Sequence, residues 1–178
     1  KTSFTPFLDS LRKESLSFEF GFANGKKSIE AVPAIIASVP SLMDNPYISS
    51  PYGNNTIRSL AHILREKGYS SAFYHGATNG SMRFDSFAAQ AGYEQYFGRY
   101  EYDNDDHFDQ TWGILDEYFN PWSARMMTKQ KQPFFSTLFT LSSHHPYFIP
   151  DHQRKNVKKG SHRAAIKLAF LNISGMFW

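Results

Sequence analysis

The chain has 178 residues, which is enough for one domain with a sizeable hydrophobic core. Hydrophobic residues make up 41% of it and aromatic residues 17%, and this composition excludes an intrinsically disordered protein, while the absence of cysteine excludes disulfide and thiolate chemistry. Much of the net charge of +3 comes from lysine and arginine between residues 154 and 167, a segment without aromatic side chains, so we predict a solvated basic tail and no nucleic-acid binding.

The sequence contains no predicted membrane span, because no apolar run approaches the roughly 20 residues that a transmembrane helix needs. Lys1 does not open a signal-peptide pattern, so we expect the chain as given to be soluble. It begins without methionine and ends on the apolar pair Phe177-Trp178. Both ends indicate a fragment of a longer protein.

Three elements are predicted before residue 40. A short helix is expected from the N-cap Thr5 to about Glu14. Alternating aromatic residues predict a strand over 17–22. Apolar residues then recur at helical spacing over 28–39, so a helix is predicted there, directly after a glycine-containing turn.

The middle of the chain predicts a helix, a strand and a second helix. Residues 40–53 are rich in Pro, Ser and Asn and predict an irregular loop. A helix is expected over 55–68, with its N-cap at the first two of these residues. A short strand over 69–74 leads directly to His75, and another helix is predicted over 82–90.

The last third predicts an acidic loop, helices and a buried strand. The loop 103–106 resembles part of a calcium site, but it lacks the expected glycine and terminal glutamate, so a solvated turn is favoured. Apolar spacing predicts one or two helices over 108–129 around Pro121. Uncharged aromatic and β-branched residues over 133–141 predict a strand covered on both faces. This order of elements predicts an α/β fold, with a sheet covered by helices.

Two of the predicted strands lead into histidine-containing loops. His75 follows the first strand and precedes a glycine-rich loop, and His144 and His145 follow the second. Because parallel strands deliver their carboxyl ends to one edge of a sheet, this pair suggests an active-site edge. A structural role for His75, or a capping role for the two later histidines, remains the alternative at this point.

Ser28 lies where the sequence places the N-terminus of a helix, behind two lysines. Unpaired backbone N–H groups and the helix dipole favour a phosphate or sulfate there. A serine in this position is either a nucleophile activated by a metal or a plain N-cap. Position alone favours the N-cap.

Several motifs taken together resemble the lipoteichoic acid synthase family, which comprises sulfatase-like phosphoglycerol transferases of the alkaline phosphatase superfamily. Their order and spacing carry more information than any one of them. The motifs are Phe22-Ala23-Asn24-Gly25-Lys26-Lys27-Ser28-Ile29-Glu30, Ser38-Val39-Pro40-Ser41-Leu42, His75-Gly76, Asn79-Gly80-Ser81-Met82, Phe97-Gly98, Trp112-Gly113-Ile114 and the segment from Thr140 to Pro146.

The resemblance implies an α/β domain on the extracytoplasmic face of the bacterial cytoplasmic membrane. It implies that a metal-activated Thr or Ser takes phosphoglycerol from phosphatidylglycerol and passes it to an acceptor, here a glycolipid or a glucan. The metal that it implies is a divalent ion, usually Mn²⁺.

The resemblance also implies roles for individual residues. Ser28 matches the nucleophile and metal ligand, and Lys27 is the rival position if the register slips by one. His75 and His144 match histidines that line the phosphoglycerol pocket. Arg83 lies one residue from the family's substrate-binding arginine, with Met82 where some members carry tryptophan.

The sequence departs from the family pattern near both ends. The metal-binding acid on the family's first strand would precede Lys1, and its Asp-His pair would follow Trp178. Phe170 stands where a Tyr-Ala-Asp stretch of the family has its aspartate. The remaining metal ligands are therefore expected outside this chain.

We interpret residues 1–178 as a partial sulfatase-like catalytic domain with an incomplete sheet. The resemblance covers about residues 4–150, and 151–178 form a divergent basic tail. The function implied is a phosphoglycerol transferase or phosphodiesterase that works through a phosphorylated Ser28. A catalytically inactive remnant that binds an anionic headgroup or glycan is the alternative, and sulfatase activity is disfavoured because the modified cysteine of sulfatases is absent.

Overall fold

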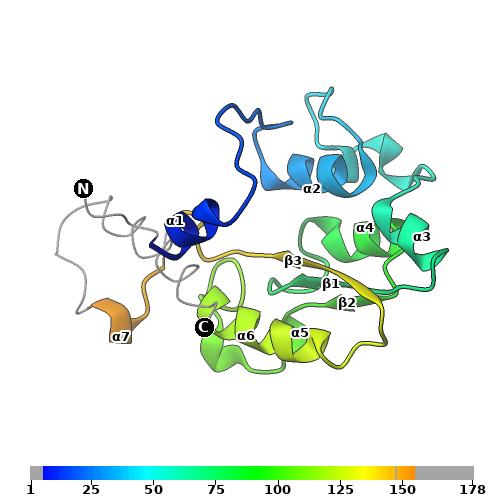
Figure 1. Ribbon diagram of the computed structural model, residues 1–178. Helices are drawn as coiled ribbons and strands as arrows, with labels where there is room; N and C mark the ends of the chain where they lie inside the picture. The colour runs from blue at the N-terminus through cyan, green and yellow to red at the C-terminus, as the bar shows by residue number, and fades with distance from the viewer. Residues whose placement is uncertain (1–5, 147, 155–178) are drawn as a thin grey trace.

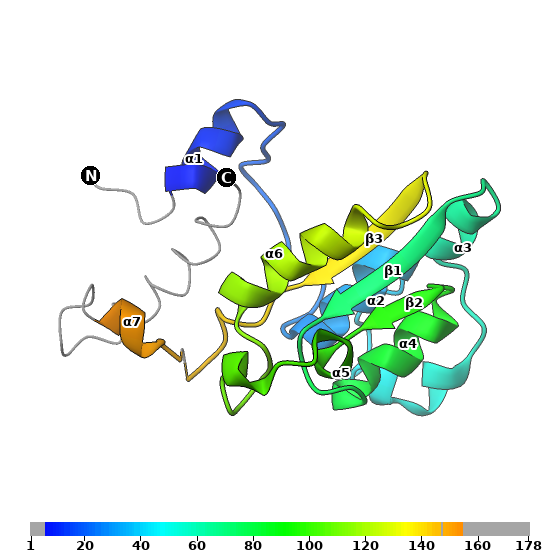
Figure 2. The ribbon, with the colours of Figure 1, turned by 90° about the horizontal axis from the view of Figure 1, so that it is seen from below.

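A three-stranded parallel sheet forms the centre of the molecule (Figures 1 and 2). The computed structural model describes residues 6–146 and 148–154. Within these residues the strand order is β2-β1-β3. The strands are β1 (Ser70–His75), β2 (Gln95–Phe97) and β3 (Phe134–Phe139).

The register of the sheet brings the ends of β1 and β3 together. His75, the last residue of β1, is paired with Phe139, the last residue of β3. Because the strands are parallel, the chain leaves both of them at the same edge of the sheet. The predicted meeting of these two strand ends is confirmed.

Helices cover both faces of the sheet (Figure 1). α2 (Ser28–Ala37), α3 (Leu60–Arg65) and α4 (Phe84–Gln90) lie on one face, and α6 (Asp116–Met127) lies on the other. The other helical segments are α1 (Pro6–Lys13), α5 (Arg99–Tyr102), α7 (Asp151–Arg154) and the 3₁₀ turns Tyr47–Ser49, Pro51–Asn54, Ser81–Arg83 and Asp105–His107.

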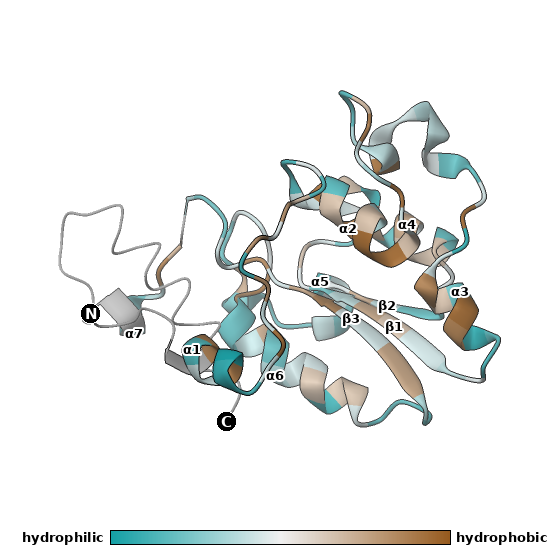
Figure 3. Cartoon of the chain, turned by 45° about the horizontal axis from the view of Figure 1, so that its top comes forward, coloured by the Kyte–Doolittle hydropathy of each residue, from teal (hydrophilic) through white to brown (hydrophobic). Residues whose placement is uncertain are grey.

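The alternating side chains of β1 join two separate hydrophobic cores. Phe73 packs with residues of α2, α3 and α4, whereas Tyr74 packs with Phe119 of α6, and all three of these aromatic side chains are buried. Hydrophobic colouring accordingly runs along the strands and the helices above them (Figure 3). Burial on both sides fixes the faces of the strand, since a slip by one residue would exchange the two sets of side chains.

The predicted α/β class is confirmed, but the strand predicted over 17–22 is wrong. These residues have no strand geometry, and the rings of Phe18, Phe20 and Phe22 are 77%, 86% and 95% exposed. Alternation alone does not make a strand where no neighbouring strand supplies hydrogen bonds.

Other element boundaries also differ from the predictions. The helix expected from residue 55 begins only at Leu60, because Ser59 is its N-cap and accepts the backbone N–H of His62. In the region 108–129 the predicted helix is confirmed for Asp116–Met127, which form α6 and contain Pro121, whereas residues 108–115 form a loop closed by an antiparallel bridge between Phe108 and Ile114. β2 and α5 were not predicted, and most of the predicted basic tail lies outside the described residues.

Candidate active site

A cavity of about 440 Å³ lies where the N-terminus of α2 meets the loop after β3. Ser28 and His144 both line it, so the structure brings two of the predicted site residues together. The lining residues are Lys27, Ser28, Ile29, Met82, Trp112, Phe139, Thr140, Leu141, Ser143 and His144.

Ser28 is the first residue of α2 and is half-buried at the cavity. The N-cap of the helix is Lys27, with φ −127° and ψ 150°, so Ser28 does not have the capping position that was its alternative role. Its side chain is therefore not required for a standard N-cap hydrogen bond. This position leaves the hydroxyl next to the positive end of a ten-residue helix.

Glu30 holds the loop in front of Ser28. Its Oε2 atom accepts the backbone N–H groups of Lys26 at 2.6 Å and Lys27 at 3.0 Å. The chain passes close to this side chain at Gly25, where φ is +105° and an added Cβ would lie 2.7 Å from the Cβ of Glu30. A buried carboxylate thus fixes the entry into α2 and the position of Ser28.

His144 lies in the loop after β3 and packs against Trp112. The two ring centroids are 3.9 Å apart, and the Trp112 indole N–H donates to the backbone carbonyl of His145 at 2.6 Å. The backbone N–H of His144 donates to the carbonyl of Leu141 at 3.1 Å, which closes a turn. His144 is exposed to solvent on its cavity side.

His75 is buried behind the cavity and is not one of its lining residues. Its ring packs against Phe84 and Phe139 at centroid distances of 4.9 and 4.8 Å, and Phe139 lines the cavity. Nδ1 lies 3.0 Å from the hydroxyl of Tyr96, whereas Nε2 is buried and has no hydrogen-bond partner among the described residues. Burial lowers the pKa of His75 to about 4, and the charge of Asp85 only partly opposes this shift.

Arg83 lines a different cavity, of about 150 Å³, and donates to the side-chain oxygen of Asn54 at 3.2 Å. Its neighbour Met82 faces the Ser28 cavity instead. Both residues have left-handed backbone, with φ of 49° at Met82 and 60° at Arg83. This unusual turn sends the two side chains to separate cavities, so the structure does not bring Arg83 to Ser28.

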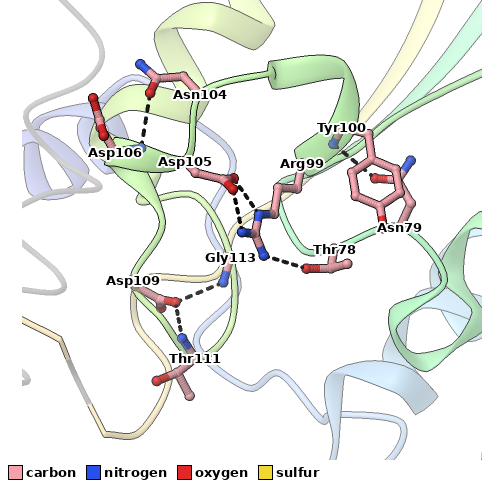
Figure 4. Close-up of polar contacts among 10 residues, drawn as sticks. All are labelled: Thr78, Asn79, Arg99, Tyr100, Asn104, Asp105, Asp106, Asp109, Thr111 and Gly113. Atoms are coloured by element: carbon pink, nitrogen blue, oxygen red, sulfur yellow. Dashed lines mark hydrogen bonds and ion pairs between the residues drawn. The ribbon is translucent and has the colours of Figure 1, made fainter.

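The described residues do not form a complete metal site. They contain no group of three His, Asp or Glu side chains that could hold an ion. The Ser28 cavity offers hydroxyl groups and one imidazole but no carboxylate, and Mn²⁺ prefers oxygen ligands that include carboxylates. The loop 103–106 is engaged otherwise, since Asp105 forms two hydrogen bonds with Arg99, at 2.7 and 2.8 Å (Figure 4).

The family model Sulfatase matches residues 1–169. The chain belongs to the sulfatase family. Membership of the family gives the ancestry of the domain and does not by itself specify the group that is transferred.

Lipoteichoic acid synthases are among the relatives of this sulfatase-family chain, which confirms the predicted resemblance. Lipoteichoic acid synthase 1 of Bacillus subtilis (strain 168) is 32% identical over 127 residues, which are 67% of this chain and 20% of that protein. Lipoteichoic acid synthase of Staphylococcus aureus (strain USA300) is 30% identical over 152 residues, which are 83% of this chain and 24% of that protein. The chain thus spans about a fifth to a quarter of these relatives.

Two solved structures share the fold. A protein in the alkaline phosphatase superfamily from Vibrio parahaemolyticus has a TM-score of 0.83 and 24% identity, covering 98% of this chain and 44% of that one. The lipoteichoic acid synthase LtaP from Listeria monocytogenes has a TM-score of 0.82 and 20% identity, covering 98% and 45%. Both confirm the predicted alkaline-phosphatase-like fold.

Among the residues that the structure describes, the sulfatase-family chain has no helix with the length and apolar character of a membrane span.

The sequence pattern did not assign a role to Trp112 or Asp116, and it related Met82 to the site only as the position where some family members carry tryptophan. The motif Trp112-Gly113-Ile114 contributed to the resemblance, and it is this tryptophan that contacts His144. Asp116 is fully buried at the start of α6, where its carboxylate binds the loop after β3. An acidic residue soon after a tryptophan and a glycine was the available signal, but it does not reveal a contact across 26 residues.

Proposed function

We propose that the protein containing this chain is a metal-dependent phosphoglycerol transferase or phosphodiesterase that acts on a phospholipid headgroup through a phosphorylated Ser28. The observation that carries the proposal is the shared cavity of Ser28 and His144 at the N-terminus of α2. The relatives named lipoteichoic acid synthase support the transfer of a phosphoglycerol group.

The proposed reaction uses Ser28 as a nucleophile. Its hydroxyl oxygen attacks phosphorus, the ester bond to the diacylglycerol oxygen breaks, and that oxygen leaves as an alcohol with the proton lost by the serine. An acceptor hydroxyl, or water in a phosphodiesterase, then attacks the phosphoserine and returns a proton to Ser28. The N-terminus of α2 stabilises the negative phosphate, and His144 offers an imidazole to its oxygens or to the glycerol.

The proposed metal is a divalent ion, expected to be Mn²⁺, which favours the deprotonated form of the attacking hydroxyl. Ser28 is the one ligand assigned in this chain, and the described residues do not complete the site. We propose His75 as a contributor to headgroup binding, through the wall formed by Phe139. The expected contribution of Arg83 has no support from this cavity, because Arg83 lines the separate cavity beside Asn54. The donor is a phosphatidylglycerol-type lipid, the acceptor a glycolipid or glucan, and the location the extracytoplasmic face of the cytoplasmic membrane.

Replacing Ser28 tests the nucleophile directly. We expect Ser28→Ala to reduce headgroup transfer on the order of 10³-fold or more and to prevent labelling of the protein, because no covalent intermediate can form. Ser28→Thr keeps a hydroxyl and serves as the matched control. The measurement is incorporation of label from phosphatidylglycerol with a radiolabelled headgroup, in the presence of Mn²⁺. Labelling that persists in Ser28→Ala rejects the proposed intermediate.

A second candidate is an inactive domain that binds an anionic headgroup or glycan. It is favoured by the lack of a three-ligand group among the described residues. Titration of the full-length protein with Mn²⁺ by calorimetry separates the candidates, because the remaining ligands are expected outside this chain. Stoichiometric, tight uptake that weakens in Ser28→Ala supports the enzyme, whereas an absence of uptake together with binding of glycerol 1-phosphate supports the second candidate.

A further inference from the structure

We propose that Asp116 is a positioning residue that holds the turn after β3 in the conformation that presents His144 to the cavity. Asp116 lies outside the cavity lining and does not contact the site of chemistry. The importance of His144 rests on the proposed function, but the positioning itself is a property of the fold.

The carboxylate of Asp116 binds the turn with both oxygens. Oδ1 accepts the backbone N–H of Leu141 at 2.8 Å, and Oδ2 accepts that of Ser142 at 2.8 Å. In the opposite direction, the backbone N–H of Asp116 donates to the hydroxyl of Ser142, also at 2.8 Å. Three hydrogen bonds therefore join the first residue of α6 to the first residues after Thr140.

Burial makes these hydrogen bonds strong constraints. The exposed fraction is 1% for Asp116, 6% for Leu141 and 7% for Ser142, so water does not replace a lost partner. Burial also raises the pKa of Asp116, while the hydrogen bonds from Leu141 and Ser142 act in the opposite direction. The carboxylate supplies one oxygen to each of the two buried N–H groups, so neither donor is left without an acceptor.

The turn held by Asp116 leads directly to His144. The His144 N–H donates to the carbonyl of Leu141, the residue that Asp116 fixes. Beyond it, the indole of Trp112 holds the carbonyl of His145 and packs on the His144 ring. The imidazole is consequently fixed from both sides of the turn.

Asp109 in turn holds the loop that carries Trp112. Its Oδ1 atom accepts the backbone N–H groups of Thr111, Trp112 and Gly113 at 2.8, 2.7 and 3.0 Å. Figure 4 shows the contacts with Thr111 and Gly113. One oxygen accepts all three, so an asparagine could provide the same acceptor. Asp116 uses both oxygens, and an asparagine there would set an N–H₂ group against a backbone N–H.

This difference provides the test. In Asp116→Asn, hydrogen exchange of the Leu141 and Ser142 amides, measured by NMR on the full chain, should accelerate about tenfold or more, because one buried N–H loses its acceptor. The amides of β1 report global stability, and their exchange should change less. Ser123→Ala is the matched control, since Ser123 is a buried residue of the same helix whose hydroxyl has no hydrogen-bond partner among the described residues.

A second readout follows the contact between Trp112 and His144. In a background with Trp122→Phe and Trp178→Phe, Trp112 is the one remaining tryptophan of the chain's three, and a neighbouring imidazole quenches indole fluorescence. His144→Ala gives the emission of Trp112 without a neighbouring imidazole. Asp116→Asn should shift emission toward this value, and Ser123→Ala should leave it unchanged.

Binding of glycerol 1-phosphate connects the positioning to the proposed function. The natural chain should bind it, and Asp116→Asn should bind it at least about tenfold more weakly at unchanged fold, as judged by circular dichroism. If the natural chain does not bind it, the proposed function loses its support, while exchange and emission still decide the role of Asp116.

Wild-type exchange at Leu141 and Ser142 with wild-type Trp112 emission in Asp116→Asn would overturn the inference. If Asp116→Asn does not fold, Ser142→Ala takes its place, because it removes one of the three hydrogen bonds and keeps both carboxylate contacts. It should give an intermediate shift in emission. An unchanged emission in Ser142→Ala overturns the inference equally.

Discussion

The His75→Phe variant should lose about 3 kcal/mol less stability than the natural chain when the pH falls from 7 to 4. The reason is that His75 has a pKa of about 4 in the folded chain and 6.5 when exposed in the unfolded chain. Between these values the unfolded chain takes up a proton that the folded chain does not. Acid therefore favours unfolding, progressively from pH 6.5 down to about 4, and phenylalanine removes this contribution.

Urea unfolding of both chains, in steps from pH 7 to pH 4, measures the difference. The observable is the change of the unfolding free energy with pH, because the substitution also removes the contact with Tyr96 and shifts stability at every pH. His152→Phe is the control for loss of an exposed histidine, and its slope also includes the loss of the contact between His152 Nε2 and Oε2 of Glu117 at 3.3 Å. Equal slopes in the natural chain and His75→Phe would show that the folded chain takes up this proton as readily as the unfolded chain, so that the pKa of His75 is not lowered.

The central strands could be predicted because their side chains identify them without reference to the rest of the chain. Neither β1 nor β3 contains an Asp, Glu, Lys or Arg, β3 is rich in aromatic residues, and β1 carries Ala72, Phe73 and Tyr74 in succession, while their parallel pairing follows from the helices between them. β2 is three residues long and begins with an exposed glutamine, so local pattern does not distinguish it from a loop. Its strand geometry comes from its register with β1.

The sequence predicted the candidate site only for residues that lie at the end of a predictable helix or strand. The start of α2 locates Ser28, and the end of β3 locates the loop of His144, so both reach one cavity. The depth of His75 was not predictable, because it depends on Phe84 and Phe139 closing over the ring. The hydrogen bonds of Asp116 depend in the same way on tertiary packing between distant segments.

Gly113→Ala should destabilise the fold by about 3 kcal/mol, near the upper range for overpacking of a buried site. A Cβ at this position would lie 2.5 Å from the carbonyl oxygen of Gly76 and 2.7 Å from Cδ1 of Leu141. The first of these atoms is backbone and accepts the N–H of Ile114 at 2.8 Å, so it cannot move away without losing that hydrogen bond. The added methyl group would therefore push both the segment after β1 and the turn after β3 away from residue 113.

The matched control for this substitution is Gly21→Ala, because an added Cβ at Gly21 meets no atom within 4 Å. Urea midpoints should therefore fall in Gly113→Ala and stay unchanged in Gly21→Ala. The damage should also appear in the site, since Leu141 both lines the cavity and carries the N–H that Asp116 accepts. If the urea midpoint is unchanged and the Leu141 amide exchanges at the natural rate, the loop that carries Trp112 can move to accommodate the added methyl group. Close packing of Gly113 against the segments after β1 and β3 would then not hold His144 in place.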